Sequence, residues 1–456
     1  MRTLIKKIVP TKVFRTIEPM GHLAEAVLTH AKHGFPARGL KVIGVTGTDG
    51  KTSTCTLITA MLRTNGYKVA MMTTISIDYG DGRGPQPNPS RLTTMGVGSL
   101  VAKIKKVKAS GAEWLVLETT SHALAQHRVW SIPYSVAVMT NLGHEHLDYH
   151  GTFERYRAAK RLLFKQTNRN KKGLRVGVAN ADDPSGALFA SDVQNPITYG
   201  VQKGDLRATD IELKPHGSTY RVKAGSDTYH ITCRLPGSFN VYNSLAALGV
   251  GRALGLSPAQ IEQGIASLDN VEGRMTRVDE GQDFTVIVDY AHTPESFEKL
   301  FKEVRPLTKG RLIAVFGSAG RRDEAKRAMQ GKVAGQLCDV VIATEEDDRD
   351  MDGGHILQQI ADGALHAGKK DGVDLFLIHD REDAVQAAVT MAKRGDIVLL
   401  LGKGHEKSIL TNGPKAEEMR HIQQDDTDKR RVIKRDYDEV KVAAQAIRFR
   451  LKSKQE

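Results

Sequence analysis

The stretch KVIGVTGTDGKTSTCTLITAMLRT, from Lys41 to Thr64, predicts a buried strand, a turn and a helix in that order. The apolar run Val42–Val45 has the length of a buried strand, and the apolar residues after position 56 recur at helical spacing. The turn reads TGTDGKT, and its glycines allow backbone N–H groups to close around phosphate oxygens in front of a helix N-terminus. Lys51 would reach the β- and γ-phosphates, and the Thr52 hydroxyl suits Mg²⁺.

This turn predicts a site for a nucleoside triphosphate. Its residues are Gly47, Thr48, Asp49, Gly50, Lys51, Thr52 and Ser53. The general phosphate-loop pattern also requires a glycine at position 45, where this chain has Val45. An ordinary strand–turn–helix connection is therefore the alternative.

The composition indicates a globular protein with two or three domains in its 456 residues. No apolar run reaches the roughly 18–20 residues that a membrane span needs. Three cysteines (Cys55, Cys233 and Cys338) lie in apolar segments, which favours reduced, buried thiols and a cytoplasmic location. A net charge of +13 suits nucleic acid or an anionic substrate with ATP, but no recognition motif or interleaved aromatics support nucleic acid.

From Leu40 onward, apolar strand-like runs alternate with helical segments, which predicts an α/β fold with parallel sheets. Between Asp205 and Leu235 the pattern changes to the polar–apolar alternation of antiparallel strands, and from Phe284 a second alternation predicts a doubly wound domain. Residues 21–33 are expected to form a helix, and residues 425–438 a solvated basic linker before a terminal helix at 439–451. The expected domains are 1–39, 40–273, 274–424 and 425–456, with a hinge at Gly273 and Arg274.

Polar clusters follow several expected strands, where open α/β sheets place their ligands. Glu118 ends the strand WLVLE and could complete a Mg²⁺ shell begun by Thr52. In TNLGHEHLDYHG (140–151) the histidines and acids suggest a metal site or proton transfer, with a solvated polar loop as the alternative. Lys160 lies among apolar residues of YRAAKRLLF (156–164), a position where a lysine is usually a surface residue.

Taken together, these motifs resemble the Mur ligase family, and within it the tripeptide-forming members that add a diamino acid. The similarity runs in family order through GTDGKT (47–52), TT (93–94), ETTSHALAQHR (118–128), TNL and HLDYHG (140–151), YRAAKRLLF (156–164), PGSFNVYN (236–243), DYAHTP (289–294) and GKGHE (402–406). The resemblance implies a central ATPase domain with a parallel sheet, a Rossmann-like C-terminal domain, and ATP-dependent amide-bond formation through an acyl phosphate in peptidoglycan synthesis.

The resemblance also assigns roles to individual residues. Lys51, His146 and Lys160 would be catalytic, and Lys160 would be carbamylated. Two Mg²⁺ ions would be held by Thr52, Glu118, His146 and the carbamylated Lys160. The remaining nucleotide contacts would be Asn240, Asn243, Arg274, Asp289 and His292. The muramoyl-dipeptide nucleotide would contact Thr93, Thr94, Thr120, Gln126 and Arg128. The diamino acid, meso-diaminopimelate or L-lysine, would contact Arg327, Arg349, Gly402 and Glu406. The enzyme is expected to be a monomer, with no nucleic-acid partner.

Structural roles are the alternatives for several of these positions. Asn240 and Asn243 could cap a helix, Asp289 and His292 could be turn residues, and Gly402–Glu406 could be a simple turn. The chain also departs from the family, which has Asp-Asn-Pro-Arg where this sequence has Glu346–Arg349. The first 39 residues resemble only the last helix and connector of the family's uridine-nucleotide domain.

Three other functions remain open on the sequence alone. A folylpolyglutamate synthase or a cyanophycin-synthetase-like ligase would share the ATP site. A non-catalytic scaffold derived from a ligase would fit the short N-terminal part, but it would have no need for the whole set of ATP and metal residues. A nucleic-acid-dependent ATPase would fit the positive charge.

Overall fold

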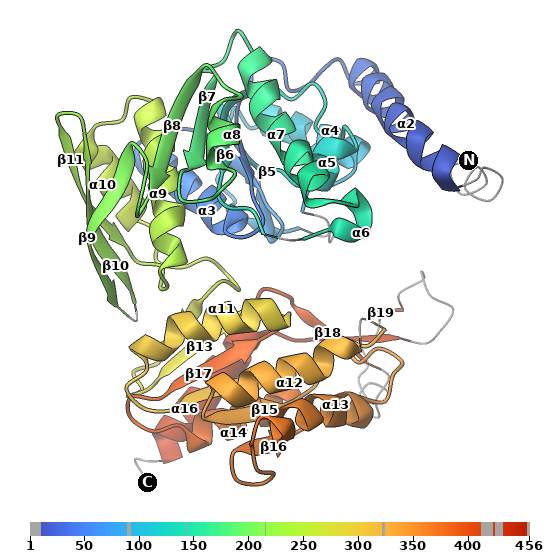
Figure 1. Ribbon diagram of the computed structural model, residues 1–456, viewed down its shortest axis with the longest axis vertical. Coiled ribbons are helices and arrows are strands. Elements are labelled where there is room, and N and C mark those ends of the chain that lie inside the picture. Colours follow the sequence, from blue (N-terminus) through green and yellow to red (C-terminus); the bar gives the residue numbers. More distant parts are fainter. Residues whose placement is uncertain are drawn as a thin grey trace. The chain divides into compact units, whose positions relative to one another are not determined.

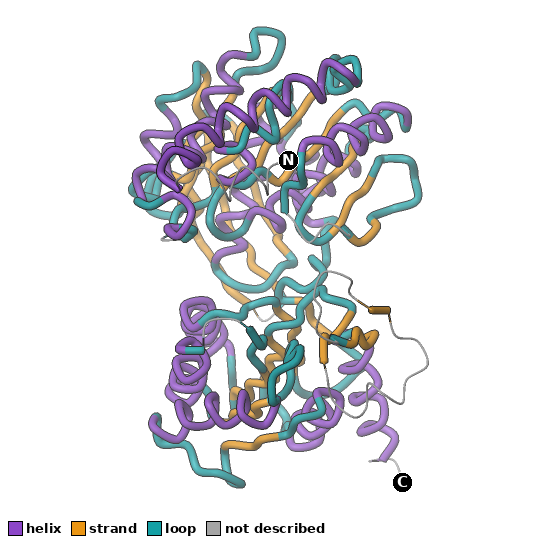
Figure 2. Tube along the Cα trace, turned by 90° about the vertical axis from the view of Figure 1, so that its right-hand side faces the viewer, coloured by secondary structure: helices purple, strands orange, loops and turns teal. Residues whose placement is uncertain are grey.

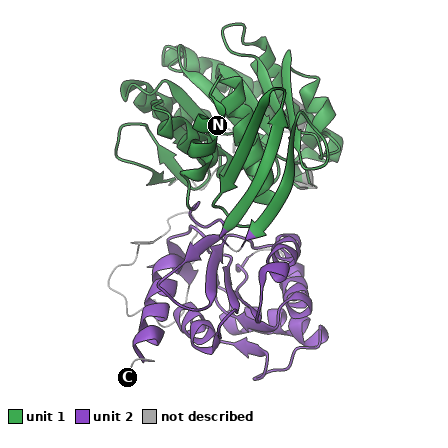
Figure 3. Cartoon of the chain, turned by 90° about the vertical axis from the view of Figure 1, so that its left-hand side faces the viewer, with its two compact units in different colours: residues 1–213, 217–269 green, residues 214–216, 270–456 purple. Residues whose placement is uncertain are grey.

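The computed structural model describes residues 11–88, 93–143, 145–214, 216–321, 324–411, 423–424 and 432–453. The chain divides into two compact units (Figure 3). Unit 1 comprises residues 1–213 and 217–269, and unit 2 comprises residues 214–216 and 270–456. The division of the chain into four parts stays a prediction.

Unit 1 is built on one sheet in the order β11-β10-β9-β8-β7-β6-β1-β5-β2-β3-β4. The central strands pair in parallel, as the continuous apolar runs predict, and β10–β11 and β2–β3 pair antiparallel. The antiparallel strands predicted between 205 and 235 therefore extend the main sheet. Its strands are β1 (Lys41–Thr46), β2 (Val69–Met72), β3 (Ser76–Asp78), β4 (Gln86–Pro87), β5 (Trp114–Glu118), β6 (Tyr134–Met139), β7 (Val176–Asn180), β8 (Asn195–Gly200), β9 (Leu206–Lys214), β10 (Gly217–Ala224) and β11 (Asp227–Cys233).

Helices cover this sheet (Figure 1). The core on one face joins the apolar side chains of α4, α5, α7 and α8 to strand residues such as Leu115 and Ala137. Helices α3, α9 and α10 pack against one another. The helices of unit 1 are α2 (Thr11–Lys32), α3 (Lys51–Thr64), α4 (Val97–Ala109), α5 (Ser121–Ala125), α6 (Leu147–His150), α7 (Phe153–Arg169), α8 (Gly186–Ala190), α9 (Phe239–Ala253) and α10 (Pro258–Ala266).

Unit 2 has a six-stranded sheet in the order β12-β13-β17-β14-β15-β16, parallel except for β12. Successive side chains of a strand point to opposite faces, so Leu399 and Leu401 pack on one face while Val398 and Leu400 pack on the other. Figure 2 shows the strands between helices. The strands are β12 (Thr276–Val278), β13 (Thr285–Asp289), β14 (Leu312–Phe316), β15 (Val340–Ala343), β16 (Leu375–Leu377) and β17 (Ile397–Leu401).

The first face of this sheet is covered by α11, α12 and α13, and the second by α14 and α16. A small antiparallel sheet joins β18, β20 and β19. The bounds of these elements are α11 (Pro294–Val304), α12 (Ala325–Leu337), α13 (Gly353–His366), α14 (Arg381–Met391), α16 (Glu439–Ser453), β18 (Ser408–Thr411), β19 (Gln423–Gln424) and β20 (Ile433–Asp436).

Two sequence-based expectations are wrong. The helix expected at 21–33 is α2, which begins ten residues earlier, at Thr11, because Pro19 and Gly21 are accommodated within it instead of marking its beginning. The expected solvated linker contains β20, where the side chain of Arg435 is buried; residues 425–431 lie outside the described residues. Among the helices that the structure describes, none is both long and apolar enough to span a membrane.

Candidate active site

The turn between β1 and α3 has the geometry of a phosphate-binding loop. Gly47 and Gly50 adopt φ values of 152° and 78°, in the region that favours glycine. A Cβ atom would lie 1.8 Å from Thr140 Oγ1 at Gly47 and 2.3 Å from Asn243 Oδ1 at Gly50. No side chain caps the N-terminus of α3, so its first N–H groups suit an anionic ligand.

Residues of the segment that follows β6 hold this loop through hydrogen bonds. Asn141 O accepts from Thr48 N at 2.8 Å, and Asn141 Oδ1 accepts from Asp49 N at 2.9 Å. Thr140 Oγ1 donates to Asp49 O at 2.6 Å. The loop is therefore preorganised by residues of the predicted TNL motif.

Thr52 and Glu118 lie together, as the prediction of a shared Mg²⁺ shell requires. Thr52 Oγ1 donates to Glu118 Oε2 at 2.9 Å, and both side chains are buried. Glu118 also accepts from Thr74 N at 2.9 Å and from Thr74 Oγ1 at 3.0 Å. A buried carboxylate beside a hydroxyl is a donor set of the hard oxygen type that Mg²⁺ prefers.

Lys160 is buried against the phosphate loop and does not lie on the surface. Its Nζ donates to Gly47 O at 2.6 Å and lies 4.7 Å from the centre of the Tyr156 ring. Burial, with a smaller contribution from the nearby charge of Lys51, lowers the pKa of Lys160 well below its usual value. Lys51 Nζ donates to Thr48 O at 2.6 Å, so both lysines converge on the same turn.

His146 lies near Glu145, His122 and Tyr156. Its Nε2 atom is 3.7 Å from Glu145 Oε2, and its ring centre is 4.6 Å from that of His122 and 6.3 Å from that of Tyr156. The backbone of His146 has a φ of 55°, a strained conformation that often occurs at functional sites. The structure thus places His146 near Tyr156 without a direct bond to Lys160.

The residues predicted to hold the muramoyl-peptide substrate form one hydrogen-bonded group. Thr94 Oγ1 accepts from Thr120 N at 3.1 Å, and Thr94 O accepts from Arg128 Nη1 at 2.8 Å. Arg128 Nε donates to Gln126 Oε1 at 2.9 Å. Thr93 Oγ1 and Thr74 Oγ1 lie 3.0 Å apart, within hydrogen-bond distance, which links this group to Glu118.

The two asparagines of α9 are bonded to each other, and Asn243 lies beside Gly50 of the phosphate loop. Thr54 Oγ1 donates to Asn243 Oδ1 at 3.2 Å, and Asn243 Nδ2 donates to Asn240 Oδ1 at 2.8 Å. Ser238 is the N-cap residue of α9, so neither asparagine has the capping role that the sequence left open.

In unit 2, the predicted nucleotide residues cluster at the end of β13. Asp289 accepts from Met275 N and from Ala291 N, each at 2.8 Å. Burial raises the pKa of Asp289, and the charge of Arg274 opposes this shift. The Arg274 guanidinium lies 5.2 Å from the centre of the Tyr290 ring. His292 Nδ1 lies 2.9 Å from Tyr290 O, and burial lowers the pKa of His292.

The GKGHE motif lies beside an acidic loop after β15. Buried Lys403 donates through Nζ to Asp347 Oδ1 at 2.9 Å and to Glu406 Oε2 at 2.8 Å. Gly402 has a φ of 99°, and a Cβ atom there would lie 2.9 Å from Glu346 Oε2. Within the described part of the chain that oxygen has no hydrogen-bond partner, and burial raises the pKa of Glu346 to about 7.

The two arginines expected at the diamino acid differ in their surroundings. Arg327 is fully buried, and its Nη1 donates to Gln359 Oε1 at 2.6 Å. Arg349 is partly exposed, has a φ of 58°, and donates its backbone N–H to Leu410 O at 2.8 Å.

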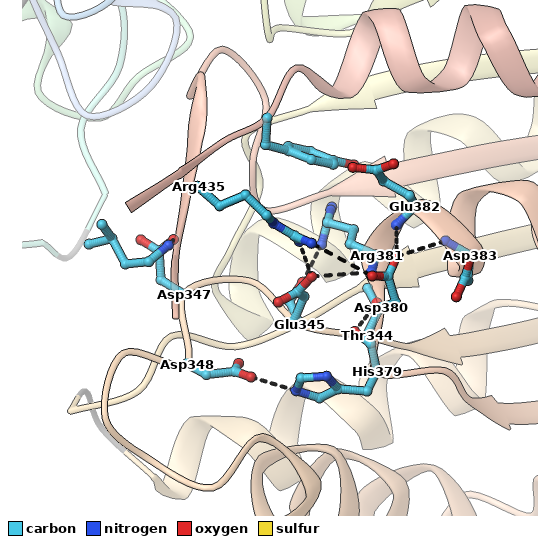
Figure 4. A network of polar contacts seen from close by, with 12 residues as sticks. Thr344, Glu345, Asp347, Asp348, His379, Asp380, Arg381, Glu382, Asp383 and Arg435 are labelled. Carbon is cyan, nitrogen blue, oxygen red and sulfur yellow. Dashed lines mark hydrogen bonds and ion pairs between the residues drawn. The ribbon is translucent and has the colours of Figure 1, made fainter. Parts of the chain in front are cut away.

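Acids and a histidine also gather at the ends of β15 and β16 (Figure 4). Potential ligand atoms of Glu345, Asp348 and His379 lie within 4.8 Å of one another. Asp348 Oδ2 and His379 Nε2 are 2.7 Å apart, and the Arg435 guanidinium bonds to Glu345 Oε1. The group is therefore engaged in internal ion pairs and does not present an open set of metal ligands.

Sequence patterns do not identify Tyr156, Lys403 or Arg381 as site residues. Tyr156 OH lies 2.9 Å from Thr48 Oγ1, and the hydroxyl of Thr48 accepts from Gly143 N at 2.8 Å. Tyr156 and Lys403 belong to motifs that the resemblance identified, so their position in those motifs was the available signal.

Models of two families match the chain, namely the Mur ligase middle domain at residues 45–251 and the Mur ligase, glutamate ligase domain at residues 273–404. A relative from Roseiflexus sp. (strain RS-1), a UDP-N-acetylmuramyl-tripeptide synthetase, is 42% identical over 414 residues, which are 88% of this chain and 81% of the relative. A UDP-N-acetylmuramoyl-L-alanyl-D-glutamate–2,6-diaminopimelate ligase from Geobacillus thermodenitrificans (strain NG80-2) is 41% identical over 395 residues, covering 86% of this chain and 79% of the relative.

A solved structure of a UDP-N-acetylmuramoyl-L-alanyl-D-glutamate–2,6-diaminopimelate ligase has a TM-score of 0.65 at 28% identity, covering 91% of this chain and 79% of the other. A folylpolyglutamate synthase of Mycobacterium tuberculosis has a TM-score of 0.63 at 16% identity, with 83% of this chain and 92% of the other covered, and shares the fold alone. The chain belongs to the Mur ligase family. Its activity is that of an ATP-dependent ligase.

Proposed function

We propose that the protein joins a diamino acid to UDP-N-acetylmuramoyl-L-alanyl-D-glutamate at the expense of ATP, as a step of peptidoglycan synthesis. The observation that carries the proposal is that Glu118 connects the phosphate loop with the residues predicted to bind the muramoyl peptide. This carboxylate bonds Thr52 of the phosphate loop and Thr74, which in turn bonds Thr93 of the predicted muramoyl-peptide group. The names of the two relatives describe the same reaction class.

A carboxylate is a poor acyl donor, so the proposed reaction has two steps. A substrate carboxylate oxygen attacks the γ-phosphorus of ATP, ADP leaves, and an acyl phosphate forms. The neutral amine of the diamino acid then attacks the carbonyl carbon, phosphate leaves, and the amine proton is lost. Such a phosphoryl transfer depends mainly on positioning and charge neutralisation.

The residues of unit 1 suit the first step. The uncapped N-terminus of α3 and the ammonium of Lys51 would bind the triphosphate. Thr52 and Glu118 would hold a Mg²⁺ ion, which supplies neutralisation of phosphate charge when bound. The side chains around Thr94 and Arg128 would hold the muramoyl-peptide substrate.

Lys160 is proposed to act as a carbamate together with His146 at a second Mg²⁺ ion. An ammonium would repel a cation, whereas addition of CO₂ to the neutral amine gives a negatively charged group. The buried position of Lys160 favours the neutral amine that this addition requires.

The residues of unit 2 are proposed to contact the nucleotide and the diamino acid. Arg274, Asp289 and His292 form the predicted nucleotide group. The carboxylates of Asp347 and Glu406 both pair with Lys403 and therefore outnumber its buried ammonium. This surplus of negative charge suits the second amino group of a diamino acid, and Arg349 and Arg327 would suit its carboxylates.

Phosphate release by the purified protein tests the proposal. The assay contains ATP, Mg²⁺ and UDP-N-acetylmuramoyl-L-alanyl-D-glutamate, with diaminopimelate, lysine or ornithine added in turn. We expect release only when both co-substrates are present, from a protein that acts as a cytoplasmic monomer. Release with folate and glutamate instead would identify a folylpolyglutamate synthase, and no release with any pair would favour a scaffold.

A further inference from the structure

Two loops of unit 2 carry most of the residues predicted to bind the diamino acid. The first follows β15 and contains Arg349, and the second follows β17 and contains Gly402 and Glu406. The strand β14 separates β15 from β17 in the sheet, so sheet pairing alone does not fix the two loops relative to each other.

Arg381 connects the bases of both loops. Its Nη1 donates to Glu345 O at 3.0 Å, and its Nη2 donates to Leu401 O at 2.6 Å. Glu345 directly precedes Glu346, and Leu401 directly precedes Gly402. Arg381 is the first residue of α14, and its side chain is 0% exposed. A planar guanidinium can hold two acceptors in a fixed geometry, which a lysine ammonium cannot reproduce.

The terminal helix supplies the counter-charge that makes this buried guanidinium tolerable. Arg381 Nε donates to Glu439 Oε2 at 2.9 Å, and Glu439 is also 0% exposed. Tyr437 OH donates to Glu439 Oε1 at 3.1 Å. A buried charge without a partner would be costly, so Glu439 is required for Arg381 to remain at this position.

Strand β20 adds a second connection to the first loop. The Arg435 guanidinium bonds to the Glu345 carboxylate, whose Oε1 also lies 3.4 Å from Arg381 N (Figure 4). Both arginines therefore act on the residue immediately before the acidic loop. The segment 432–453 is thus connected to the predicted diamino-acid residues through buried polar contacts.

We propose that Arg381 is a positioning residue for the diamino acid, which holds the loops after β15 and β17 in their binding arrangement with Glu439 as its counter-ion. The proposal rests on the proposed function for the identity of the ligand. Arg381 is proposed to act through the loops and not on the substrate itself, since each of its three nitrogens donates to one of the two backbone carbonyls or to Glu439.

The substitution Arg381→Lys tests the proposal, with Arg450→Lys as a matched control. Arg450 is also buried in unit 2 and bonds to two backbone carbonyls, those of Val389 and Ala392, but neither carbonyl belongs to the two loops. We expect Arg381→Lys to raise the KM for the diamino acid at least tenfold, with the KM for ATP changed less than twofold. Arg450→Lys should leave both KM values within twofold of the original protein.

Amide hydrogen exchange in the absence of ligands gives a readout that does not depend on activity. Arg381→Lys should accelerate exchange at least tenfold in peptides covering residues 345–349 and 401–406, and Arg450→Lys should not. If the original protein has no ligase activity, the proposed function fails, and the exchange result still decides whether Arg381 holds the loops. Equal effects of the two variants on KM or on exchange in these peptides would overturn the proposal.

Discussion

Lys160 illustrates how burial changes the chemistry open to a single side chain. Lys160 is 2% exposed, and its amine donates to a backbone carbonyl of the phosphate loop. Desolvation disfavours the charged form, and the proximity of Lys51 acts in the same direction. The position therefore suits a modified lysine better than a free ammonium.

Lys160→Ala should reduce kcat by about 100-fold or more, as expected for loss of a preorganised electrostatic group. Short carboxylates such as acetate should restore part of the activity, because they can occupy the space of the proposed carbamate. Phosphate release with and without acetate measures both effects. Lys165→Ala on the exposed side of α7 is the control and should be active without acetate; full activity of Lys160→Ala would remove its assigned role.

Glu346 predicts a pH dependence of stability in unit 2. Burial raises its pKa to about 7 in the folded chain, above the value of 4.5 for an unperturbed glutamic acid. A raised pKa means that the folded state binds the proton more tightly than the unfolded state. The resulting stabilisation is complete below about pH 4.5 and is lost as the pH rises through 7, with a magnitude of about 3 kcal/mol.

Glu346→Gln should remove this contribution, so the variant should gain stability relative to the original protein between pH 5 and pH 8. Hydrogen exchange of the β17 peptide measures the change, because Trp114 and Trp130 both lie in unit 1 and tryptophan fluorescence does not report on unit 2. A difference between the two proteins that stays constant over this pH range would contradict the assignment.

At the scale of whole elements, the helices α12 and α13 pack through glycines. A Cβ atom added at Gly331 would lie 1.9 Å from Ile360 O, and one added at Gly363 would lie 1.9 Å from Ala328 O. The obstacle in both cases is backbone, which cannot rotate away as a side chain can. The two helices can approach this closely only because both positions lack a side chain.

Gly331→Ala should therefore destabilise the protein by about 3 kcal/mol or more, in the range of severe overpacking. Gly98→Ala is the matched control, because Gly98 lies in α4 with no atom near the added Cβ. That variant should be unchanged or stabilised by up to about 1 kcal/mol. Thermal unfolding followed by circular dichroism compares the two, and equal behaviour would disprove the packing argument.

Sequence patterns predicted the strands in which successive residues are all buried. The apolar runs of β1, β5, β14 and β17 fixed the parallel sheets because such strands are buried on both faces. Strand β8 was missed because its residues 195–198 are exposed or only partly buried and show no clear period. The charged strand β20 was missed for the same reason, since it is held by side-chain pairing that its composition does not reveal.

Some of the site residues could likewise be predicted from the sequence, and others could not. Gly47, Gly50 and Lys51 could be inferred from the residues alone, since a turn of that composition between a strand and a helix has a specific physical use. Arg381 and Lys403 could not be inferred in this manner, because charged residues are almost never fully buried unless they are paired. Glu439, the partner of Arg381, and Asp347, one of two partners of Lys403, lie far away in sequence, so only the folded chain shows these pairings.

At the scale of the whole molecule, the two units have separate hydrophobic cores. One core of unit 1 is formed by residues between 37 and 193, and the two cores of unit 2 are formed by residues between 275 and 447. Each unit is large enough to unfold cooperatively on its own. A ligand that binds one folded unit should therefore stabilise that unit by mass action.

A non-hydrolysable ATP analogue with Mg²⁺ should stabilise unit 1 by about 2.7 kcal/mol when present at 100 times its dissociation constant. Fluorescence of Trp114 and Trp130 during denaturant unfolding measures this effect in the full chain, because both tryptophans belong to unit 1. Lys51→Ala should abolish most of the stabilisation at the same analogue concentration, since its ammonium is predicted to contact the phosphates. Lys165→Ala removes the same charge from an exposed position of α7 and should retain the full effect. If both variants were stabilised equally, the analogue would bind somewhere other than the loop between β1 and α3, and the nucleotide site would have to be sought elsewhere in the molecule.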